Sequence, residues 1–219
     1  MSMDAIDNPG DQTSLALDTQ LSAEDLARAD LYGLLALLFY SGPAQELLEK
    51  IANFNTAIEQ PEVVSSSLLQ GPWDELVRVA KNASSEDWQT EYETYFVGVG
   101  KQEIFLYGSY YLTGFLNEKP LAYLREELKV LGLEGSDDIS ETEDHIACLC
   151  EIMRYLIAGE DLGVCNLTQQ KKFFNEQIRP WAGQLFDTLE AHPGLTYYRH
   201  VGLLSRTFFE IEGQAFDML

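Results

Sequence analysis

The chain has 219 residues, 46% of them hydrophobic, which is enough to bury a core and argues against wholesale disorder. Its 36 acidic and 14 basic side chains give a formal charge of −22, which disfavours nucleic acid and anionic membranes and favours basic partners. A purely solubilising surface would show the same acidity. The three cysteines, Cys148, Cys150 and Cys165, lack paired spacing, so we expect a reducing compartment, the cytoplasm, rather than a disulfide framework.

The beginning of the chain carries no targeting signal that we can identify. Residues 1–20 lack Lys and Arg and have no apolar run, so we expect a disordered leader instead of a signal peptide. Ser22 and Asp25 then predict a capped helix that runs to about Tyr40. Apolar residues surround almost its whole circumference, so this helix should lie centrally in the core.

Helical patterns continue along the rest of the chain, without strand alternation or an Asn-Gly hairpin. The expected helices lie near 44–54, 61–70, 73–83, 84–96, 109–117, 120–132, 140–158, 168–178, 180–191 and 196–213. The acidic segment 134–139 is the best candidate for a linker. We therefore predict an all-α helical bundle of about ten helices, whose N-terminal part (21–135) and C-terminal part (136–219) pack into the same globule.

The stretch from Ser140 to His145 has the most chemical character. Ser140 followed by Glu143 predicts a capping box at the start of an amphipathic helix. Glu141, Asp144 and His145 would then lie one turn apart. Three titratable groups at such a junction are either a lock for the hinge or a binding site.

Signals for enzymatic chemistry are weak. A di-iron bundle needs Glu-x-x-His on two helices, whereas Glu141 and His145 are four apart on one. Gly98 to Lys101 lacks the first glycine and the final Ser or Thr of a phosphate loop. Since no nucleophile of a hydrolytic triad is recognisable either, we predict no enzyme activity, no metal and no cofactor.

The order of four motifs carries a family resemblance. The motifs are an aromatic helix end before a glycine (91–98), the Tyr107-Gly108-Ser109-Tyr110-Tyr111-Leu112 segment, the pattern Asp137-x-x-x-Glu141-x-x-Asp144-His145, and Pro180-Trp181 before an aromatic terminal helix. Over roughly residues 22–213 this order resembles the TorD/DmsD-like family of cytoplasmic chaperones for molybdenum oxidoreductases, the redox enzyme maturation proteins. One departure is Asp137, because the family usually has Glu there.

The resemblance implies a chaperone that binds the twin-arginine leader, the apoprotein, or both, of a molybdopterin oxidoreductase during cofactor insertion and before export. The peptide-binding candidates are Tyr95, Phe96, Tyr107, Ser109, Tyr111, Asp144 and His145, and the hinge candidates are Asp137, Glu141, Asp144 and His145. Each has a structural alternative: core packing for Tyr95 and Phe96, an N-cap for Ser109, and a junction lock for Asp144 and His145.

Two other functions stay open at this point. The first is a delta-type assembly factor that grips a folded catalytic subunit without engaging its leader. The second is an enzyme that uses the Glu141, Asp144 and His145 cluster. A linker at 134–139 permits either a monomer or a domain-exchanged dimer.

Overall fold

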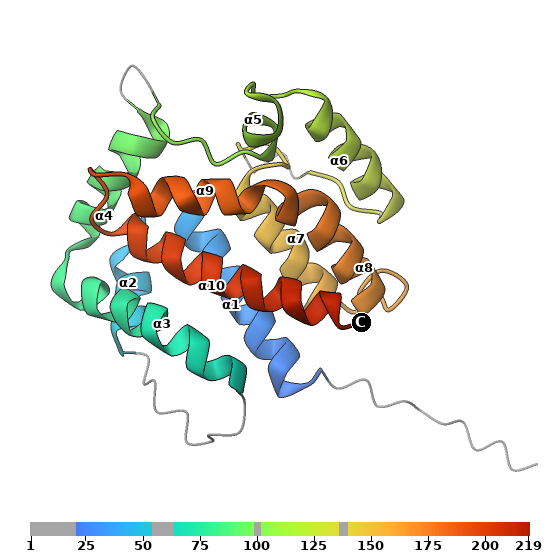
Figure 1. The fold of residues 1–219 in the computed structure, drawn as a ribbon, viewed down its shortest axis with the longest axis horizontal. Coiled ribbons are helices and arrows are strands. Elements are labelled where there is room, and N and C mark those ends of the chain that lie inside the picture. The colour runs from blue at the N-terminus through green and yellow to red at the C-terminus, as the bar shows by residue number, and fades with distance from the viewer. Residues whose placement is uncertain (1–20, 54–63, 99–101, 136–139) are drawn as a thin grey trace, which may run out of the picture.

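The computed structural model describes residues 21–53, 64–98, 102–135 and 140–219. Within these ranges the protein is all-α, which confirms the predicted fold class (Figure 1). The helices are α1 (Ala23–Tyr40), α2 (Gln45–Asn53), α3 (Val64–Asn82), α4 (Ser85–Tyr92), α5 (Gly108–Thr113), α6 (Lys119–Val130), α7 (Ile146–Ala158), α8 (Leu167–Phe173), α9 (Arg179–Ala191) and α10 (Tyr198–Asp217). Two π-helical turns, η1 (Glu93–Val97) and η2 (Phe174–Ile178), continue α4 and α8.

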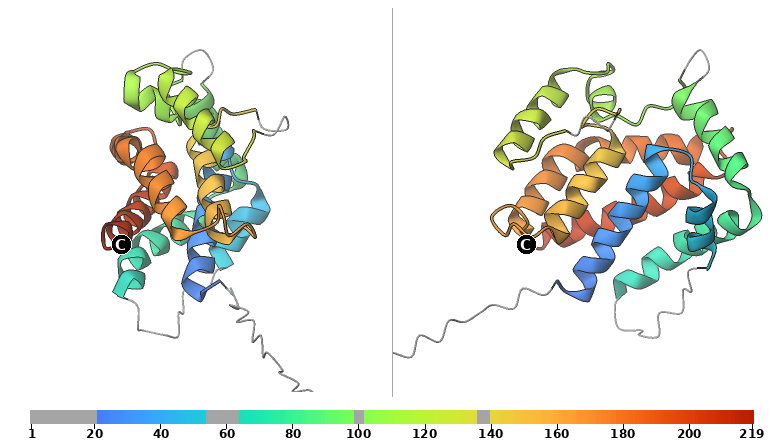
Figure 2. Two further views of the ribbon diagram at one scale, coloured as in Figure 1. Left: turned by 90° about the vertical axis from the view of Figure 1, so that its right-hand side faces the viewer. Right: turned by 180° about the vertical axis from the view of Figure 1, so that it is seen from behind.

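The helices pack around one core to which both predicted parts of the chain contribute. α1 lies along α7, α9 and α10 form a hairpin, and α3 packs against α2 and α10 (Figures 1 and 2). Side chains from α1, α7 and α10, including Leu35, Met153 and Phe208, belong to the same buried cluster. The pair α5 and α6 lies at one edge of the molecule, with α5 against α9.

Helix α1 follows the sequence prediction closely. The backbone N–H of Asp25 donates to the Ser22 hydroxyl at 3.0 Å, so the predicted N-cap is confirmed. Tyr32 and Leu35 are fully buried, as expected for a central helix. Near the end of α1, however, Leu37 and Tyr40 remain exposed, at 56% and 40%.

The sequence predicted two helices, at 61–70 and 73–83, but the structure has the single helix α3 there, so the predicted break is wrong. α3 continues through Pro72, although proline removes one helical hydrogen bond and normally kinks or ends a helix. The apolar residues after Pro72, among them Leu76 and Val79, are buried where α3 packs on its neighbours. Tertiary packing therefore overrides the local preference. Pro61 lies outside the described residues.

A buried carboxylate joins α4 to α10. Glu91, at the end of α4, accepts hydrogen bonds from the backbone N–H groups of Thr196, Tyr197 and Tyr198 at 2.6, 2.9 and 2.8 Å. These groups begin α10 and have no partner inside the helix, so a carboxylate there satisfies them and complements the helix dipole. The first sequence motif thus contains a structural cap that acts over more than 100 positions.

A buried ion pair joins α1 to α10. Arg28 donates from Nε and a terminal nitrogen to the two carboxylate oxygens of Glu212, at 2.7 and 2.8 Å. Tyr32 and Gln170 add hydrogen bonds to the same pair, from α1 and α8. Burial alone would lower the pKa of Arg28, but the Glu212 carboxylate more than offsets this and raises it.

Within the ranges given above, no helix is both long and apolar enough to span a bilayer.

Candidate functional site

Two segments far apart in sequence meet at an isolated antiparallel bridge between Tyr107 and His145. The backbone N–H of Gly108 donates to the carbonyl of Asp144 at 2.9 Å, and that of Ile146 donates to the carbonyl of Leu106 at 2.8 Å. The bridge therefore holds the second and third sequence motifs side by side, just before α5 and α7 begin.

The Asp144 side chain fixes the start of α5. Its carboxylate is buried, and it accepts the backbone N–H of Ser109 at 2.8 Å and the hydroxyl of Thr142 at 2.7 Å. The first bond satisfies one of the N–H groups that a helix start leaves open. Asp144 thus has the geometry of a lock between its own segment and α5.

Ser109 is not the N-cap of α5, contrary to the alternative that the sequence suggested. Tyr107 has that position, and Ser109 is the second helical residue. Its Oγ is buried and has no hydrogen-bond partner among the described residues.

His145 caps α7. Its Nδ1 accepts the backbone N–H of Ala147 at 3.2 Å, which assigns the ring proton to Nε2. The ring is buried and meets the Tyr107 ring edge-on, with centroids 4.9 Å apart. Burial lowers its pKa to about 4, despite the nearby carboxylates of Glu141 and Asp144, so the imidazole is neutral at pH 7.

The predicted capping box of Ser140 and Glu143 is wrong. α7 begins at Ile146, and residues 140–145 are not helical. The tertiary bonds of the bridge and of Asp144 hold this segment against α5, so local capping chemistry loses to long-range pairing. Glu143 instead forms an ion pair with Arg125 of α6.

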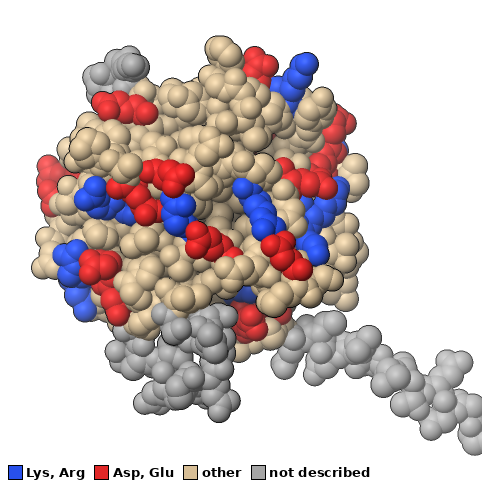
Figure 3. All heavy atoms as spheres, in the orientation of Figure 1, with Lys and Arg blue, Asp and Glu red and all other residues tan. Residues whose placement is uncertain are grey.

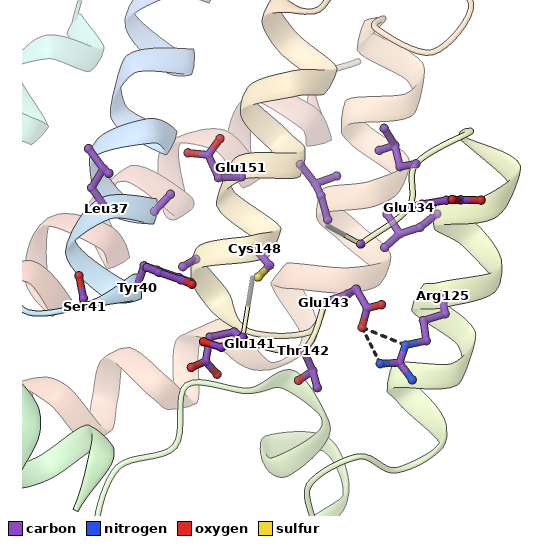
Figure 4. Close-up of a pocket in the computed structure, with 17 residues that line it drawn as sticks. Leu37, Tyr40, Ser41, Arg125, Glu134, Glu141, Thr142, Glu143, Cys148 and Glu151 are labelled. Carbon is purple, nitrogen blue, oxygen red and sulfur yellow. Dashed lines mark hydrogen bonds and ion pairs between the residues drawn. The ribbon is translucent and has the colours of Figure 1, made fainter. Parts of the chain in front are cut away.

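Glu141 connects the bridge to a groove. The Tyr107 hydroxyl donates to its carboxylate, and burial together with this bond raises the pKa of Tyr107. Glu141 also lines a groove of about 760 Å³ between α1, α6 and α7 (Figure 4). The right-hand view of Figure 2 shows the side of the molecule where α1 and α7 lie next to each other.

The residues that line the groove include an apolar set, here called the floor, and an acidic set, here called the rim. The floor is formed by side chains from the three helices and the following loop: Ala36, Leu37, Tyr40, Leu128, Leu133, Ala147, Cys148 and Ile152. The rim carries four carboxylates, Glu134, Glu141, Glu143 and Glu151. Arg125 and Arg154 pair with Glu143 and Glu151, whereas Glu134 and Glu141 have no Lys or Arg partner among the described residues.

The predicted peptide-binding residues do not gather at this groove. Tyr95 lies against His192, with ring centroids 4.8 Å apart, and Phe96 is buried against Tyr92 and Tyr198. Tyr111 stacks on Trp181 at 5.6 Å. Only the Tyr107, Ser109, Asp144 and His145 group is brought together, with Glu141 beside it. Asp137 lies outside the described residues.

Sequence reasoning missed Leu37, Tyr40, Arg125 and Ile152 as lining residues. Leu37 and Tyr40 are three apart on α1 and so share one face. An apolar pattern around the whole of that helix was the available signal, because a helix without a polar face must present some apolar side chains to a partner or a ligand.

The two cysteines of α7 have different positions. Cys150 is fully buried, as expected for a small core residue, whereas Cys148 lines the groove. Burial, aided by the rim carboxylates, raises the pKa of Cys148 to about 12, so it is a thiol and a poor nucleophile at pH 7. In the described part of the chain no three His, Cys, Asp or Glu side chains are grouped so that they could hold a metal ion.

The chain is similar to known proteins over much of its length. Residues 65–187 match the family described as nitrate reductase delta subunit. Over 205 residues the chain is 25% identical to a protein named Chaperone protein TorD from Vibrio atlanticus (strain LGP32), a match that covers 85% of this chain and 93% of that relative. The family match includes the bridge and the acidic rim of the groove.

Proposed function

We propose a function from one premise: the chain belongs to the nitrate reductase delta subunit family and is a TorD/DmsD-like maturation chaperone for a molybdoenzyme. These family names imply a non-enzymatic role. The finer proposal is that the protein acts in the cytoplasm and binds the twin-arginine leader of its client while the client's cofactor is inserted.

The groove between α1, α6 and α7 is the observation that carries this proposal. A twin-arginine leader has paired guanidinium groups followed by an apolar segment. The rim offers carboxylates, which bind guanidinium through charge-assisted hydrogen bonds, and the floor offers apolar surface. Both chemical needs of the leader are thus met within one groove.

The floor of the groove is accessible to a ligand. Leu37 and Tyr40, at the C-terminal end of α1, are 56% and 40% exposed (Figure 4). Exposed apolar side chains next to a polar rim are typical of interaction sites. Covering them with the apolar part of a leader would remove that surface from water, at roughly 25 cal/mol for each Å².

The bridge residues have a supporting role in this proposal. Asp144 and His145 are buried and hold the starts of α5 and α7, so they act on the ligand through the position of Glu141. Glu141 faces the groove and is held by the Tyr107 hydroxyl. We assign direct contact to Glu141 and positioning to Tyr107, Asp144 and His145.

Calorimetry with a synthetic leader tests the proposal. The probe is a peptide from a molybdoenzyme of the same genome, with its arginine pair and apolar segment. We expect saturable binding that weakens when both arginines become Gln and when Leu37→Asp places a charge on the groove floor. The matched control is Leu26→Asp, because Leu26 is also exposed on α1 but does not line the groove. Absence of saturable binding by every leader of that genome contradicts leader recognition.

A second candidate function rests on a different surface. Leu112, Phe115, Leu116, Tyr123 and Val130 of α5, α6 and their connection are all exposed, with Phe115 and Tyr123 at 68% and 70%. In Figure 3 the top of the molecule over α5 is mostly uncharged, while acidic and basic side chains flank it on the side of α6. Such a surface suits the body of a folded catalytic subunit, as in a delta-type assembly factor.

Co-purification separates the two functions. If the body of the client docks on α5 and α6, a client without its leader still co-purifies, and Phe115→Ser with Tyr123→Ser abolishes this. If the leader alone is gripped, its deletion ends co-purification.

A further inference from the structure

The groove already contains a guanidinium group that belongs to the protein itself. Arg125 projects from α6 toward the rim, and its Nε and one terminal nitrogen contact the same oxygen of Glu143, at 2.9 and 2.8 Å (Figure 4). Both side chains line the groove. Burial would raise the pKa of Glu143, yet the Arg125 guanidinium holds it below its usual value.

This ion pair is open to exchange. The Arg125 side chain is 49% exposed and that of Glu143 is 23% exposed, so water can replace either partner at little cost. Exposed pairs of this kind contribute little to stability, because solvent screens them and ordering two long side chains costs entropy. An arginine from a ligand could therefore replace Arg125 without disturbing the core.

The helix that carries Arg125 forms a separate wall of the groove. Residues with a left-handed backbone lie on either side of α6: Asn117 at φ 59° before it and Gly132 at φ 70° after it. Beyond its buried leucines, α6 is tied to the rest of the protein by ion pairs and hydrogen bonds, from Arg125 to Glu143 and from Glu127 to Lys172 and Gln177. Of these contacts, the Arg125–Glu143 pair is the one whose two side chains both line the groove.

We propose that Arg125 occupies the site of a client arginine on Glu143, so that leader binding replaces an internal ion pair with an intermolecular one. This inference rests on the proposed function and adds to it a residue that competes with the ligand. Glu143 becomes the guanidinium-binding carboxylate, and Arg125 becomes an intramolecular competitor that sets the affinity. This competitor lowers the affinity of every ligand that needs Glu143 by the same factor, so only peptides that bind Glu143 well are held at low concentration.

The site should prefer arginine to lysine in the ligand. Two nitrogens of Arg125 converge on one carboxylate oxygen, a contact that a planar guanidinium makes and a single ammonium cannot reproduce. Replacing the leader's arginines by lysines should therefore weaken binding even though the charge is kept.

The test measures the affinity of four chains for one synthetic peptide with an Arg-Arg pair followed by an apolar segment. The chains are wild type, Arg125→Ala, Glu143→Gln and Lys129→Ala. Lys129 lies one turn after Arg125 on α6, pairs with Glu126 and does not line the groove. Its removal changes the net charge as much as Arg125→Ala does, so it controls for long-range attraction.

We expect Arg125→Ala to bind the Arg-Arg peptide about two- to fivefold more tightly than wild type, the range that an exposed ion pair is worth. Glu143→Gln should weaken binding about tenfold, because a charge-assisted bond is lost. Lys129→Ala should match wild type. The Lys-Lys peptide should bind more weakly than the Arg-Arg peptide to each chain, and Arg125→Ala should raise its affinity by a similar factor, because the same competitor is removed. Equal unfolding midpoints in urea verify that all four chains are folded.

The outcomes separate a failure of the competitor role from a failure of leader binding. If wild type binds but Arg125→Ala and Lys129→Ala have the same affinity, or Glu143→Gln binds normally, the competitor role is wrong while leader binding stands. If wild type fails to bind and Arg125→Ala binds, the competitor role is supported in its strongest form. If neither binds, leader recognition and the competitor role are both overturned.

Discussion

Two Arg–Glu pairs in this protein have the same chemistry in opposite environments. In the core, Arg28 and Glu212 join α1 to α10, with side chains only 15% and 3% exposed. At the groove, Arg125 and Glu143 join α6 to the rim, with side chains 49% and 23% exposed. The shortest N–O distances are similar, 2.7 and 2.8 Å, so distance alone does not distinguish the two pairs, although Arg28 contacts both oxygens of Glu212 and Arg125 contacts only one of Glu143.

Their surroundings determine what each pair can do. A buried charge cannot regain water when its partner leaves, so the Arg28–Glu212 pair fixes the arrangement of the helices. A half-exposed charge can regain water when its partner leaves, so the Arg125–Glu143 pair can exchange partners. The comparison teaches that an ion pair at a binding site is recognised by its exposure and by the surface next to it, not by its length.

The largest effect should come from breaking the buried pair. Glu212→Gln removes the buried carboxylate from Arg28, whose guanidinium keeps only the partly exposed Asp25 carboxylate at 3.0 Å, and this costs about 3 kcal/mol of unfolding free energy. Urea unfolding followed by circular dichroism measures this loss. The control is Asp217→Asn, which breaks the exposed pair with Arg179 and should leave the unfolding free energy nearly unchanged. Equal losses in the two variants would remove the distinction between the environments.

The second-largest loss of stability should come from Asp144, next to the Tyr107–His145 bridge. Asp144→Ala leaves the buried N–H of Ser109 without its acceptor, and we expect a loss of about 2 to 3 kcal/mol. Asp144→Asn keeps an acceptor oxygen and should lose less. Hydrogen exchange at the Ser109 amide distinguishes a local opening of α5 from a global effect. Unchanged protection in Asp144→Ala would show that this carboxylate does not hold the start of α5.

A pH effect of about 2 kcal/mol should come from His145. Its folded pKa of about 4 lies below the ordinary value of 6.5, so between these values the unfolded state binds a proton that the folded state does not. Stability therefore falls as the pH is lowered from 7 to 5, by about 2 kcal/mol from this group. Above pH 6.5 the contribution is complete, and below about pH 4 no more is lost.

His145→Asn isolates this contribution. Asparagine is a good N-cap and can accept the Ala147 N–H as the imidazole does, but it does not titrate. The acidic surface carries its own pH dependence, because protonation relieves self-repulsion, and this part is common to both chains. On going from pH 7 to pH 5, wild type should lose about 2 kcal/mol more stability than His145→Asn. A constant difference would contradict a neutral, buried imidazole.

The smallest effect on stability should come from the groove pair. Arg125→Ala and Glu143→Gln should each change the unfolding free energy by less than about 1 kcal/mol, because both side chains are partly hydrated. The same variants should change peptide affinity in opposite directions. A loss of several kcal/mol from either would make this pair structural, like Arg28 and Glu212.

Local signals in the sequence were sufficient where neighbouring residues decide the structure. The Ser22 cap of α1 is an example, because its partner is Asp25, three residues away. The start of α7 was predicted wrongly, since the acceptors and donors that set it lie on residues 106–109. No capping rule contains that information.

The candidate site was predictable only in part. The sequence grouped Glu141, Asp144 and His145 on the expectation of a shared helix, whereas the structure holds them in an irregular segment and adds Tyr107 through the bridge. The groove beside it depends on which face of α1 is left uncovered by other helices. That is a property of the whole packing arrangement, and so Leu37 and Tyr40 could not be identified from periodicity alone.

The remote cap by Glu91 has a consequence for how the chain folds. Its carboxylate reaches N–H groups up to 107 positions later, so closing that loop costs more entropy than any local contact. Contacts of such sequence separation form slowly. During synthesis the Glu91 carboxylate therefore lacks these partners until residues 196–198 are made, so this chaperone would complete the contact only after nearly all of the described chain has left the ribosome.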